Sequence, residues 1–196
     1  MAIYTRTGDS GETDLRAGMR VAKHTPRIEA IGTLDELVAV LGMVRAQRPV
    51  SEVERLVDRV QNELLALGAE LAHPEVAPPA ARRIRREHIA ALETDIDRYE
   101  PTLPELRQFL VPAGASTAAA LHWARCVCRR AERRLVALRH HDPQSVPAEW
   151  LAYLNRLSDL LFVLARAENQ ATGHGDQLWR NLPPARPGDA VPPGTP

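Results

Sequence analysis

The sequence predicts an all-α protein, a five-helix bundle preceded by a non-helical N-terminal segment. Three observations support this fold class. Apolar residues recur at helical spacing along most of the chain, alternating strand-like patterns are nearly absent, and prolines separate the successive helical segments. With 196 residues, the chain has the length of one ordinary domain and can bury about 70% of its unfolded surface without disulfides or metal ions.

The first two helices have the clearest boundaries. Thr25-Pro26 is typical of a helix start, because Pro is favoured at the first helical position, and apolar residues at helical spacing follow to about Gln47. Pro49 then ends this helix. The second helix opens with Ser51 and Glu54, which match an S-x-x-E capping box, and continues with the most regular apolar stripe of the chain: Val53, Leu56, Val60, Leu64, Leu67 and Leu71.

Three further helices follow a proline-containing loop at residues 73–81. The third ends at Pro101 and leads into a non-helical passage, after which Ser116 is the candidate N-cap of a fourth helix that reaches about His140. The fifth, Trp150–Ala167, is apolar on almost every face, which is typical of a helix in the middle of a fold. We expect a single domain over residues 1–182, with a loop at 1–24, helices at about 25–180, and a disordered proline-rich tail at 183–196.

Charge and apolar pattern exclude several classes of protein. The 25 acidic and 25 basic residues cancel, so the basic excess of a general nucleic-acid binder is missing. The N-terminus lacks the apolar segment of a signal peptide, and the longest apolar run, Leu160–Ala165, is too short to span a bilayer. We therefore expect a soluble, cytoplasmic protein in which Cys126 and Cys128, the only cysteines, are reduced thiols.

The fourth helix carries a stripe of arginines on one face. Arg125, Arg129 and Arg133 recur every four residues, and Arg130 and Arg134 crowd further positive charge beside them. Such a stripe is usually a solvated basic face. The crowding also fits a site that an anion completes, and a triphosphate is suitable because guanidinium groups bind phosphate oxygens in pairs. The spacing alone leaves both interpretations open.

The N-terminal segment offers groups for the same kind of anion. Thr5, Thr7 and Thr13 supply hydroxyls, while Gly8 and Gly11 allow backbone N–H groups to approach an oxyanion closely. Loops rich in Gly and Thr are common, so this signal is weak without further support.

Four single residues are ambiguous on pattern alone. Lys23, the only lysine in the chain, either marks a place for a compact ammonium group or survives by chance in an Arg-rich composition. Asn155 lies among apolar neighbours and either binds a ligand or satisfies a buried backbone group. Asp35 borders the apolar face of the first helix and needs a cationic partner, unless Thr33–Glu36 form a capping box there. Phe109, in a loop, has the character of a core plug.

Six segments, in order, resemble the PduO-type ATP:cob(I)alamin adenosyltransferases. They are I-Y-T-R-T-G-D-S-G-E-T (Ile3–Thr13), R-V-A-K (Arg20–Lys23), G-T-L-D-E-L (Gly32–Leu37), F-L-V-P-A-G (Phe109–Gly114), H-W-A-R-C-V-C-R-R-A-E-R (His122–Arg133) and Y-L-N-R-L-S-D-L-L-F-V-L-A-R (Tyr153–Arg166). G-D-Q-L-W-R (Gly175–Arg180) is a shorter match near the end. The combination is highly specific and spans most of the chain before the tail. It implies the ferritin-like helical bundle of cobalamin adenosyltransferases.

The resemblance also implies an activity, the transfer of the 5′-deoxyadenosyl group of ATP to the cobalt(I) of a corrinoid, giving adenosylcobalamin and triphosphate. Arg125 would pair with Asp35 across a subunit boundary, and Phe109 would press on the corrin and keep the lower axial ligand off the cobalt of cob(II)alamin. Mg²⁺ would accompany ATP near Glu132 without a dedicated protein site. The implied ATP-binding residues are Thr5, Arg6, Thr7, Gly8, Thr13, Asp14, Lys23, Arg129, Arg130, Glu132, Arg133 and Asn155.

The implied partners are further copies of the chain in a homotrimer with active sites between subunits, a corrinoid reductase, and a client enzyme that depends on adenosylcobalamin. The sequence departs from the family pattern at Arg6 (commonly Lys), Asp14 (a small hydroxyl residue), Ala113 (Gly) and Cys126 (Thr). None of these changes removes a group that the chemistry needs, because cobalt(I) is itself the nucleophile.

Two other functions compete with adenosyl transfer. A non-catalytic escort that binds ATP and hands over a corrinoid would share the N-terminal loop but would not need Phe109 or the Asp35–Arg125 pair. An RNA-binding helical protein would use the arginine stripe, but zero net charge and the lack of aromatic platforms disfavour it. The joint presence of Phe109, Asp35 and Arg125 favours the enzyme.

Overall fold

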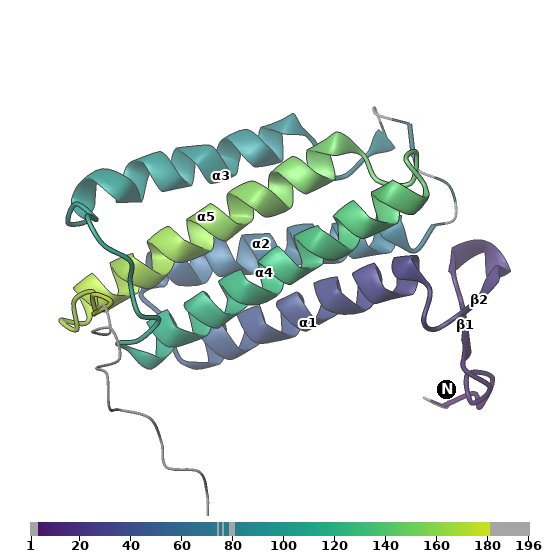
Figure 1. The fold of residues 1–196 in the computed structure, drawn as a ribbon, viewed down its shortest axis with the longest axis horizontal. Coiled ribbons are helices and arrows are strands. Elements are labelled where there is room, and N and C mark those ends of the chain that lie inside the picture. Colours follow the sequence, from purple (N-terminus) through teal and green to yellow (C-terminus); the bar gives the residue numbers. More distant parts are fainter. Residues whose placement is uncertain (1–3, 74, 76, 79–80, 181–196) are drawn as a thin grey trace, which may run out of the picture.

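The computed structural model describes residues 4–73, 75, 77–78 and 81–180, and in this part of the chain five α-helices dominate (Figure 1). The predicted all-α class and the order of the helices are confirmed. Two short 3-10 turns, Arg16–Gly18 and Glu100–Thr102, accompany them. The helices are α1 (Pro26–Ala46), α2 (Ser51–Leu71), α3 (Arg86–Tyr99), α4 (Ser116–His141) and α5 (Ala148–Ala171).

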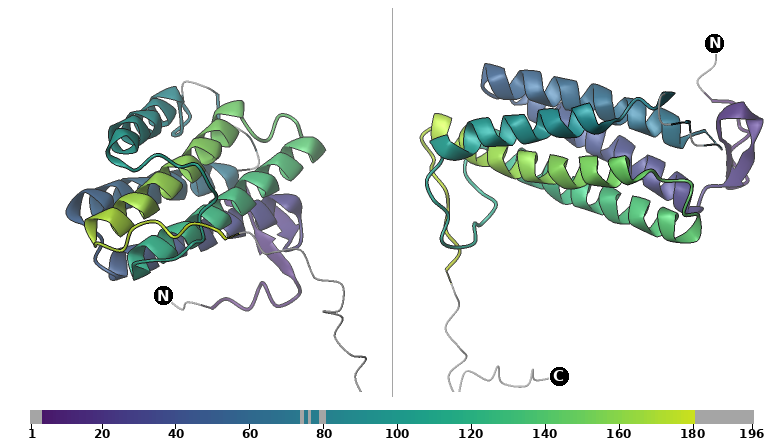
Figure 2. Two further views of the ribbon diagram at one scale, coloured as in Figure 1. Left: turned by 60° about the vertical axis from the view of Figure 1, so that its left-hand side comes forward. Right: turned by 90° about the horizontal axis from the view of Figure 1, so that it is seen from above.

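The helices run side by side along the long axis of the molecule (Figure 1, Figure 2). Helix α4 packs against both α1 and α5, while α2 packs on α1 and α3 packs on α5. Helix α5 contacts α2, α3 and α4, so its apolar residues face the core on several sides and Trp150 and Tyr153 are fully buried. This environment explains why the segment is apolar on almost every face, as the sequence predicted.

A small β-hairpin lies in the N-terminal segment, where the sequence showed no strand pattern. Strand β1 (Glu12–Asp14) pairs antiparallel with β2 (Arg20–Ala22). Strands of three residues are too short for an alternating pattern to be recognised in sequence. The hairpin projects beyond the end of the bundle at which α1 begins (Figure 1), and the Arg16 N–H donates to the carbonyl of Ala72, 3.0 Å away, just after α2.

The predicted capping box at the start of α2 is wrong. Val50, rather than Ser51, occupies the N-cap position, and the Glu54 carboxylate accepts a 2.7 Å hydrogen bond from Nε of Arg45 instead of reaching back along the backbone. The Val50 N–H donates to Oε1 of Glu168 at 2.8 Å. A carboxylate that is distant in sequence therefore takes the place of the local cap.

Thr25 is the N-cap of α1, as predicted, but two other predicted caps also differ from the structure. Ser116 is the first residue of α4 and Ala115 is its N-cap, with the Ala115 N–H donating to Oδ1 of Asn169 at 2.9 Å. The alternative capping box at Thr33–Glu36 is wrong, because α1 begins at Pro26 and the Thr33 hydroxyl donates back to the carbonyl of Glu29 at 2.7 Å.

Within the described ranges, no helix is both long enough and apolar enough to cross a membrane. The tail at residues 183–196, expected to be disordered, lies outside the described residues.

We expect Glu168→Ala to lower the free energy of unfolding by about 2–3 kcal/mol. The Glu168 side chain is 1% exposed and also accepts the Thr117 hydroxyl at 2.9 Å, so its removal leaves two donors without their charged acceptor. Glu168→Gln, which keeps one carbonyl oxygen, should lose less. Urea denaturation measures both, with Glu87→Ala on the exposed face of α3 as the control. A loss below about 0.5 kcal/mol for Glu168→Ala, the size of an ordinary surface change, would contradict this role.

Candidate active site

Lys23 organises the loop between the N-terminus and the hairpin. Its ammonium Nζ donates to the carbonyl of Gly8 at 2.8 Å, and its backbone N–H donates to the carbonyl of Gly11 at 2.9 Å. A Cβ added at Gly8 would lie 3.1 Å from this ammonium nitrogen, so the loop closes tightly on it. The Thr5 and Thr7 hydroxyls lie 2.8 Å apart on the same exposed loop. The compact ammonium therefore has a definite place in the loop, which composition alone did not establish.

Arg20, the first residue of β2, is a residue near the loop to which the sequence analysis gave no role. Its guanidinium donates to the carbonyl of Thr7 at 2.8 Å and contacts the carboxylates of Glu12 and Asp14, each at 3.3 Å. Asp14 lies directly opposite Arg20 in the strand register, so its carboxylate serves the hairpin. Thr13 points to the other face of β1 because side chains alternate along a strand. Only the register brings these charges together, and the sequence did not reveal the strands.

The arginines of α4 divide into two sets. Arg130 forms an ion pair with Glu36, and Arg134 lies 3.5 Å from Glu29, so both meet acids of α1. For Arg129 and Arg133, no acidic partner lies among the residues that the structure describes. Acidic side chains of α1 thus balance the positive charge of Arg130 and Arg134. The charge of Arg129 and Arg133 is left without such a partner among the described residues, as expected where an anion binds.

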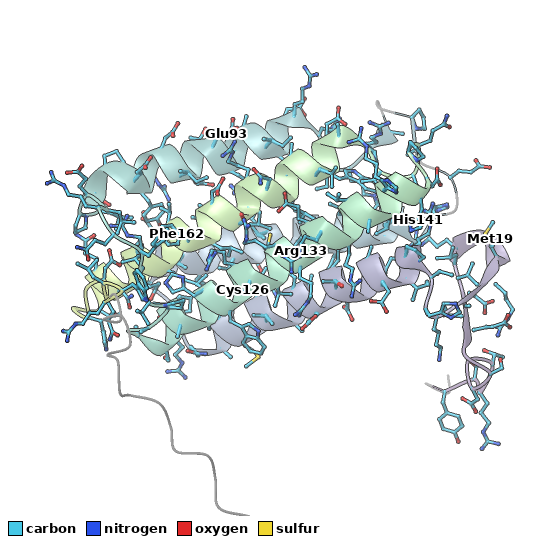
Figure 3. The ribbon with its side chains drawn as sticks, in the orientation of Figure 1. Met19, Glu93, Cys126, Arg133, His141 and Phe162 are labelled. Carbon is cyan, nitrogen blue, oxygen red and sulfur yellow. The ribbon has the colours of Figure 1, made fainter. Side chains whose placement is uncertain are left out.

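Asn155 joins α5 to this surface of α4. Its Nδ2 donates to Oε1 of Glu132 at 3.2 Å, and its side chain is exposed. The interpretation that Asn155 satisfies a buried backbone group is therefore wrong. Arg129 and Arg133 lie within one helical turn of Glu132 on α4, so the contact brings Asn155 close to them. Figure 3 labels Arg133 on this helix. Four of the predicted ATP-binding residues are thereby assembled on one surface.

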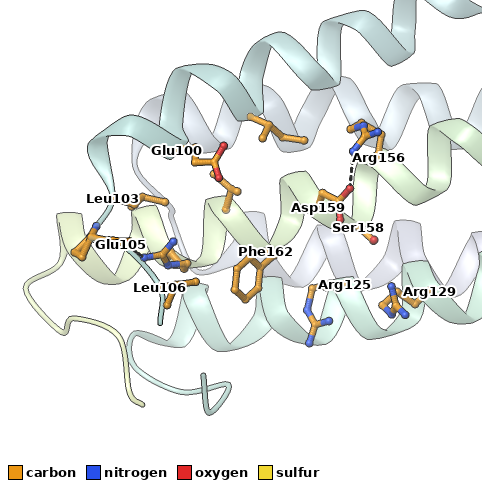
Figure 4. A pocket seen from close by; sticks show the side chains of 14 residues that line it. Glu100, Leu103, Glu105, Leu106, Arg125, Arg129, Arg156, Ser158, Asp159 and Phe162 are labelled. Atoms are coloured by element: carbon orange, nitrogen blue, oxygen red, sulfur yellow. Dashed lines mark hydrogen bonds and ion pairs between the residues drawn. The ribbon is translucent and has the colours of Figure 1, made fainter. Parts of the chain in front are cut away.

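A cavity of about 780 Å³ lies next to this surface, between α3, α4 and α5 (Figure 4). Arg125, Arg129 and Phe162 contribute to its wall. The guanidinium carbon of Arg125 lies 5.9 Å from the centre of the Phe162 ring, and its buried Nε has no hydrogen-bond partner within the described ranges. Burial and the charge of Arg125 lower the pKa of His122, whose ring lies 5.9 Å from that of Phe162. Phe162 was not singled out from the sequence.

Phe109 lies on the loop between α3 and α4, and the interpretation as a core plug is wrong. Its ring is 81% exposed and meets Trp179 edge to face, with 6.4 Å between the ring centres. The carbonyl of Phe109 accepts the Trp179 N–H at 2.7 Å. Trp179 was missed as a site residue, although the Gly175–Arg180 match had indicated its segment. The two exposed rings form an apolar surface at this end of the bundle.

The structure does not bring the whole predicted site together in one chain. The hairpin lies beyond one end of the bundle and the Phe109 loop lies at the opposite end (Figure 1, Figure 2). Asp35 is exposed on α1, and no ion pair joins it to Arg125 or to any other described residue. Arg6, at φ +62°, is exposed with its guanidinium over the Tyr4 ring. The assembled part is the surface of α4 and α5.

Comparison with known proteins covers most of the chain. The family model for cobalamin adenosyltransferase matches residues 3–168. The corrinoid adenosyltransferase PduO of Citrobacter freundii is 47% identical over 170 residues, which make up 86% of this chain and 50% of that protein. The cobalamin adenosyltransferase of Cupriavidus metallidurans is 42% identical over 180 residues, which make up 91% of this chain and 94% of that protein. The chain spans about half the length of the Citrobacter relative and nearly all of the Cupriavidus one.

Solved structures agree with the sequence match. A phenylalanine-to-alanine variant of the PduO-type ATP:corrinoid adenosyltransferase from Lactobacillus reuteri, complexed with cobalamin and ATP, superposes with a TM-score of 0.85 at 31% identity. The superposition covers 92% of this chain and 100% of that one. An arginine-to-lysine variant of the same enzyme, complexed with ATP, gives a TM-score of 0.83. Helical bundle, motifs and relatives coincide, and the chain is a member of the cobalamin adenosyltransferase family.

Proposed function

We propose that this protein transfers the 5′-deoxyadenosyl group of ATP to the cobalt(I) of a corrinoid, giving adenosylcobalamin and triphosphate. The observation that carries the proposal is the surface of α4 and α5, where Arg129 and Arg133 lack acidic partners among the described residues and lie beside Asn155 and Glu132. Membership of the family supports it, as does the Lactobacillus structure complexed with cobalamin and ATP. Incubation with ATP, Mg²⁺ and chemically reduced cobalamin should yield the light-sensitive adenosylated product. ATP binding without that product would favour an escort instead.

The reaction assigns the protein a binding and charge-balancing task. The electron pair of cobalt(I) forms the bond to the 5′-carbon, the carbon–oxygen bond to the phosphate chain breaks, and triphosphate leaves with that bond's electrons. No general base is needed because no proton moves. Arg129 and Arg133 stabilise the negative charge that develops on the leaving triphosphate. Glu132, the only acid between Arg125 and Arg133, supplies a hard oxygen of the kind that Mg²⁺ prefers, next to the phosphates.

The N-terminal loop supplies the second half of the ATP site in this proposal. Thr5, Thr7 and Gly8 lie on an exposed loop that Lys23 holds in shape, and Arg6 adds a positive charge there. Thr13 and Asp14 belong to β1 in the adjoining hairpin. Arg130 meets Glu36 through Nη2, so only its remaining N–H groups are free to reach phosphate.

A second copy of the chain completes the site, and the family resemblance implies a homotrimer. Three features support an intersubunit site. The hairpin projects away from its own bundle (Figure 1), Asp35 is exposed, and the Nε of Arg125 is buried without a hydrogen-bond partner among the described residues. Exposed apolar side chains on α1 and α4, Met43, Trp123 and Val136, offer contact surface. We therefore propose an Asp35–Arg125 ion pair between neighbouring subunits.

The reaction also implies partners that the chain must meet. Cobalt must arrive at the site as cobalt(I) or be reduced there, so a corrinoid reductase must supply the electron. An enzyme that depends on adenosylcobalamin then takes the product. The two cysteines, Cys126 and Cys128, are free thiols, which supports a reducing, cytoplasmic location.

We expect Arg129→Ala to reduce kcat/KM for ATP roughly 10- to 150-fold, because it removes a charge-assisted contact worth about 1.5–3 kcal/mol in the transition state. The matched control is Arg134→Ala on the same helix, whose guanidinium meets Glu29 and should leave the kinetics unchanged. Steady-state kinetics with varied ATP measure both variants. Wild-type kinetics in Arg129→Ala would contradict this role and would favour the interpretation of the stripe as a solvated basic face.

We expect Phe109→Ala to lose most activity when the assay begins from cobalt(II) and a mild reductant. An apolar ring that displaces the axial ligand of cobalt(II) raises the potential at which cobalt(II) is reduced to cobalt(I). Cobalt(I) made beforehand does not need this reduction step. The variant should therefore keep a much larger share of activity in an assay that begins from cobalt(I), with little change in KM for ATP. Its melting temperature should stay near the wild-type value, because the ring is 81% exposed. Leu65→Ala, an exposed apolar truncation on α2, is the control. Equal losses in the two assays would refute the redox role of Phe109.

A further inference from the structure

One turn of α5 holds the loop that carries Phe109. Asn169 lies on this turn with its side chain 2% exposed. Its Oδ1 accepts the N–H of Ala115 at 2.9 Å, and its Nδ2 donates to the carbonyl of Ala113 at 3.0 Å. One carboxamide thus bonds both a donor and an acceptor at the end of the loop, immediately before α4.

Gly114, between these two residues, fits against the same carboxamide. Its φ of +105° is a conformation that residues with a Cβ rarely adopt. A Cβ at this position would lie 2.0 Å from Oδ1 of Asn169, well inside contact distance. Glycine is therefore required here both for the backbone conformation and for space. The close contact with Asn169 holds the turn in one position against α5.

The beginning of the loop is tied to α5 as well. Arg166, 6% exposed, donates from Nη2 to the carbonyl of Pro104 and from Nε to Oδ2 of Asp176 at 2.8 Å. Asp176 leads into a short strap, residues 177–179, that pairs with the middle of the loop. In this pairing the Val111 N–H donates to the carbonyl of Gln177 at 2.8 Å, and the bridge partners are Leu110 and Leu178.

These hydrogen bonds matter because packing against the core does not hold the exposed Phe109 ring in place. Most of its surface is open, and its aromatic neighbour Trp179 sits on the strap, which depends on Arg166 through Asp176. The height and direction of the ring therefore follow from the backbone of the loop. That backbone is anchored by hydrogen bonds from Asn169 and Arg166 that are buried or part-buried, and these hold a geometry more firmly than fully solvated ones.

We propose that Asn169 is a positioning residue for Phe109: its carboxamide, with Gly114 packed against it, holds the loop at the height from which the ring displaces the axial ligand of cobalt. Asn169 does not touch the corrinoid itself. This inference rests on the proposed function of the protein and on the role proposed there for Phe109.

The test compares Asn169→Asp and Gly114→Ala with Phe109→Ala. Asn169→Asp keeps the acceptor for Ala115 but turns a second oxygen towards the carbonyl of Ala113, and Gly114→Ala disturbs the same contact from the loop side. We expect both variants to lose about 10- to 100-fold in the assay that begins from cobalt(II), the size of effect that a displacement of about 1 Å produces, and less than about 3-fold from pre-made cobalt(I).

Electron paramagnetic resonance gives a readout that a general loss of stability would not change. With ATP present, cob(II)alamin on the wild-type protein should lose the splitting from its axial nitrogen ligand. Both variants should retain that splitting in a larger share of the bound corrinoid. Tyr153→Phe is the matched control, because Tyr153 lies on α5 like Asn169. The change deletes a part-buried 2.6 Å hydrogen bond to Glu63 of α2 and leaves the loop untouched. It should lower the melting temperature and leave the spectrum unchanged.

The possible outcomes separate the inference from the function on which it rests. If the wild-type protein forms no cobalt–carbon bond, the proposed function is wrong. If Phe109→Ala falls equally in the two assays, the role of Phe109 is wrong, and the positioning role of Asn169 with it. If Phe109→Ala separates the assays while Asn169→Asp and Gly114→Ala do not, or if their spectra match the wild type, only the positioning role is overturned.

Discussion

Close packing of α4 between α1 and α5 decides which way its arginines face. Small side chains, Ala124, Cys128 and Ala131, are fully buried along one side of α4, so the helix has no freedom to rotate without opening the core. The opposite side of α4, which carries Arg129 and Arg133, therefore faces the surface. Residues of like charge one turn apart destabilise a free helix. In the proposed function a triphosphate would bind here and remove that repulsion, so the surface that costs stability in the empty protein would favour the ligand.

The C-terminal turn of α5 likewise fixes the position of functional residues, at one end of the bundle. Arg166, Glu168 and Asn169 are buried polar residues near the C-terminal end of α5, and each binds backbone or side-chain groups from another part of the chain. Buried polar groups with all partners in place favour one arrangement over its alternatives. This turn sets the starts of α2 and α4 and the loop between α3 and α4. The bundle thus presents an arginine surface on its side and a firmly tethered loop at its end.

Most of the helical architecture could be predicted from the sequence, because apolar spacing reports which face of each helix is buried. The caps could not. Ser51 and Ser116 carry the local signal, but acceptors on α5 that are distant in sequence take over their task, and only the tertiary structure brings Glu168 and Asn169 there. The hairpin escaped prediction because two strands of three residues leave no periodicity.

The parts of the site that a sequence motif defines could be predicted. The parts that depend on how the helices pack, such as which arginines meet an acid, could not. The arginine stripe suggested an anion, but the division between Arg130, which meets Glu36, and Arg129, which meets no acid among the described residues, depends on the position of α1. The exposure of Phe109 contradicts its interpretation as a core plug, and nothing in the local sequence of the loop indicates whether its ring packs inwards or faces solvent. Phe162 was hidden in an apolar helix among residues that look alike in sequence.

In the proposed oligomer each active site is divided between two chains, with Asp35 from one and Arg125 from the next. The most direct test combines Asp35→Ala chains with Arg125→Ala chains in one oligomer, each variant being nearly inactive alone. If the pair crosses the boundary, mixed oligomers regain sites in which both residues are wild type. At equal amounts these are about one quarter of all sites, the product of two one-in-two chances. We therefore expect adenosylation at about one quarter of the wild-type rate. A mixture no more active than the separate variants would contradict it.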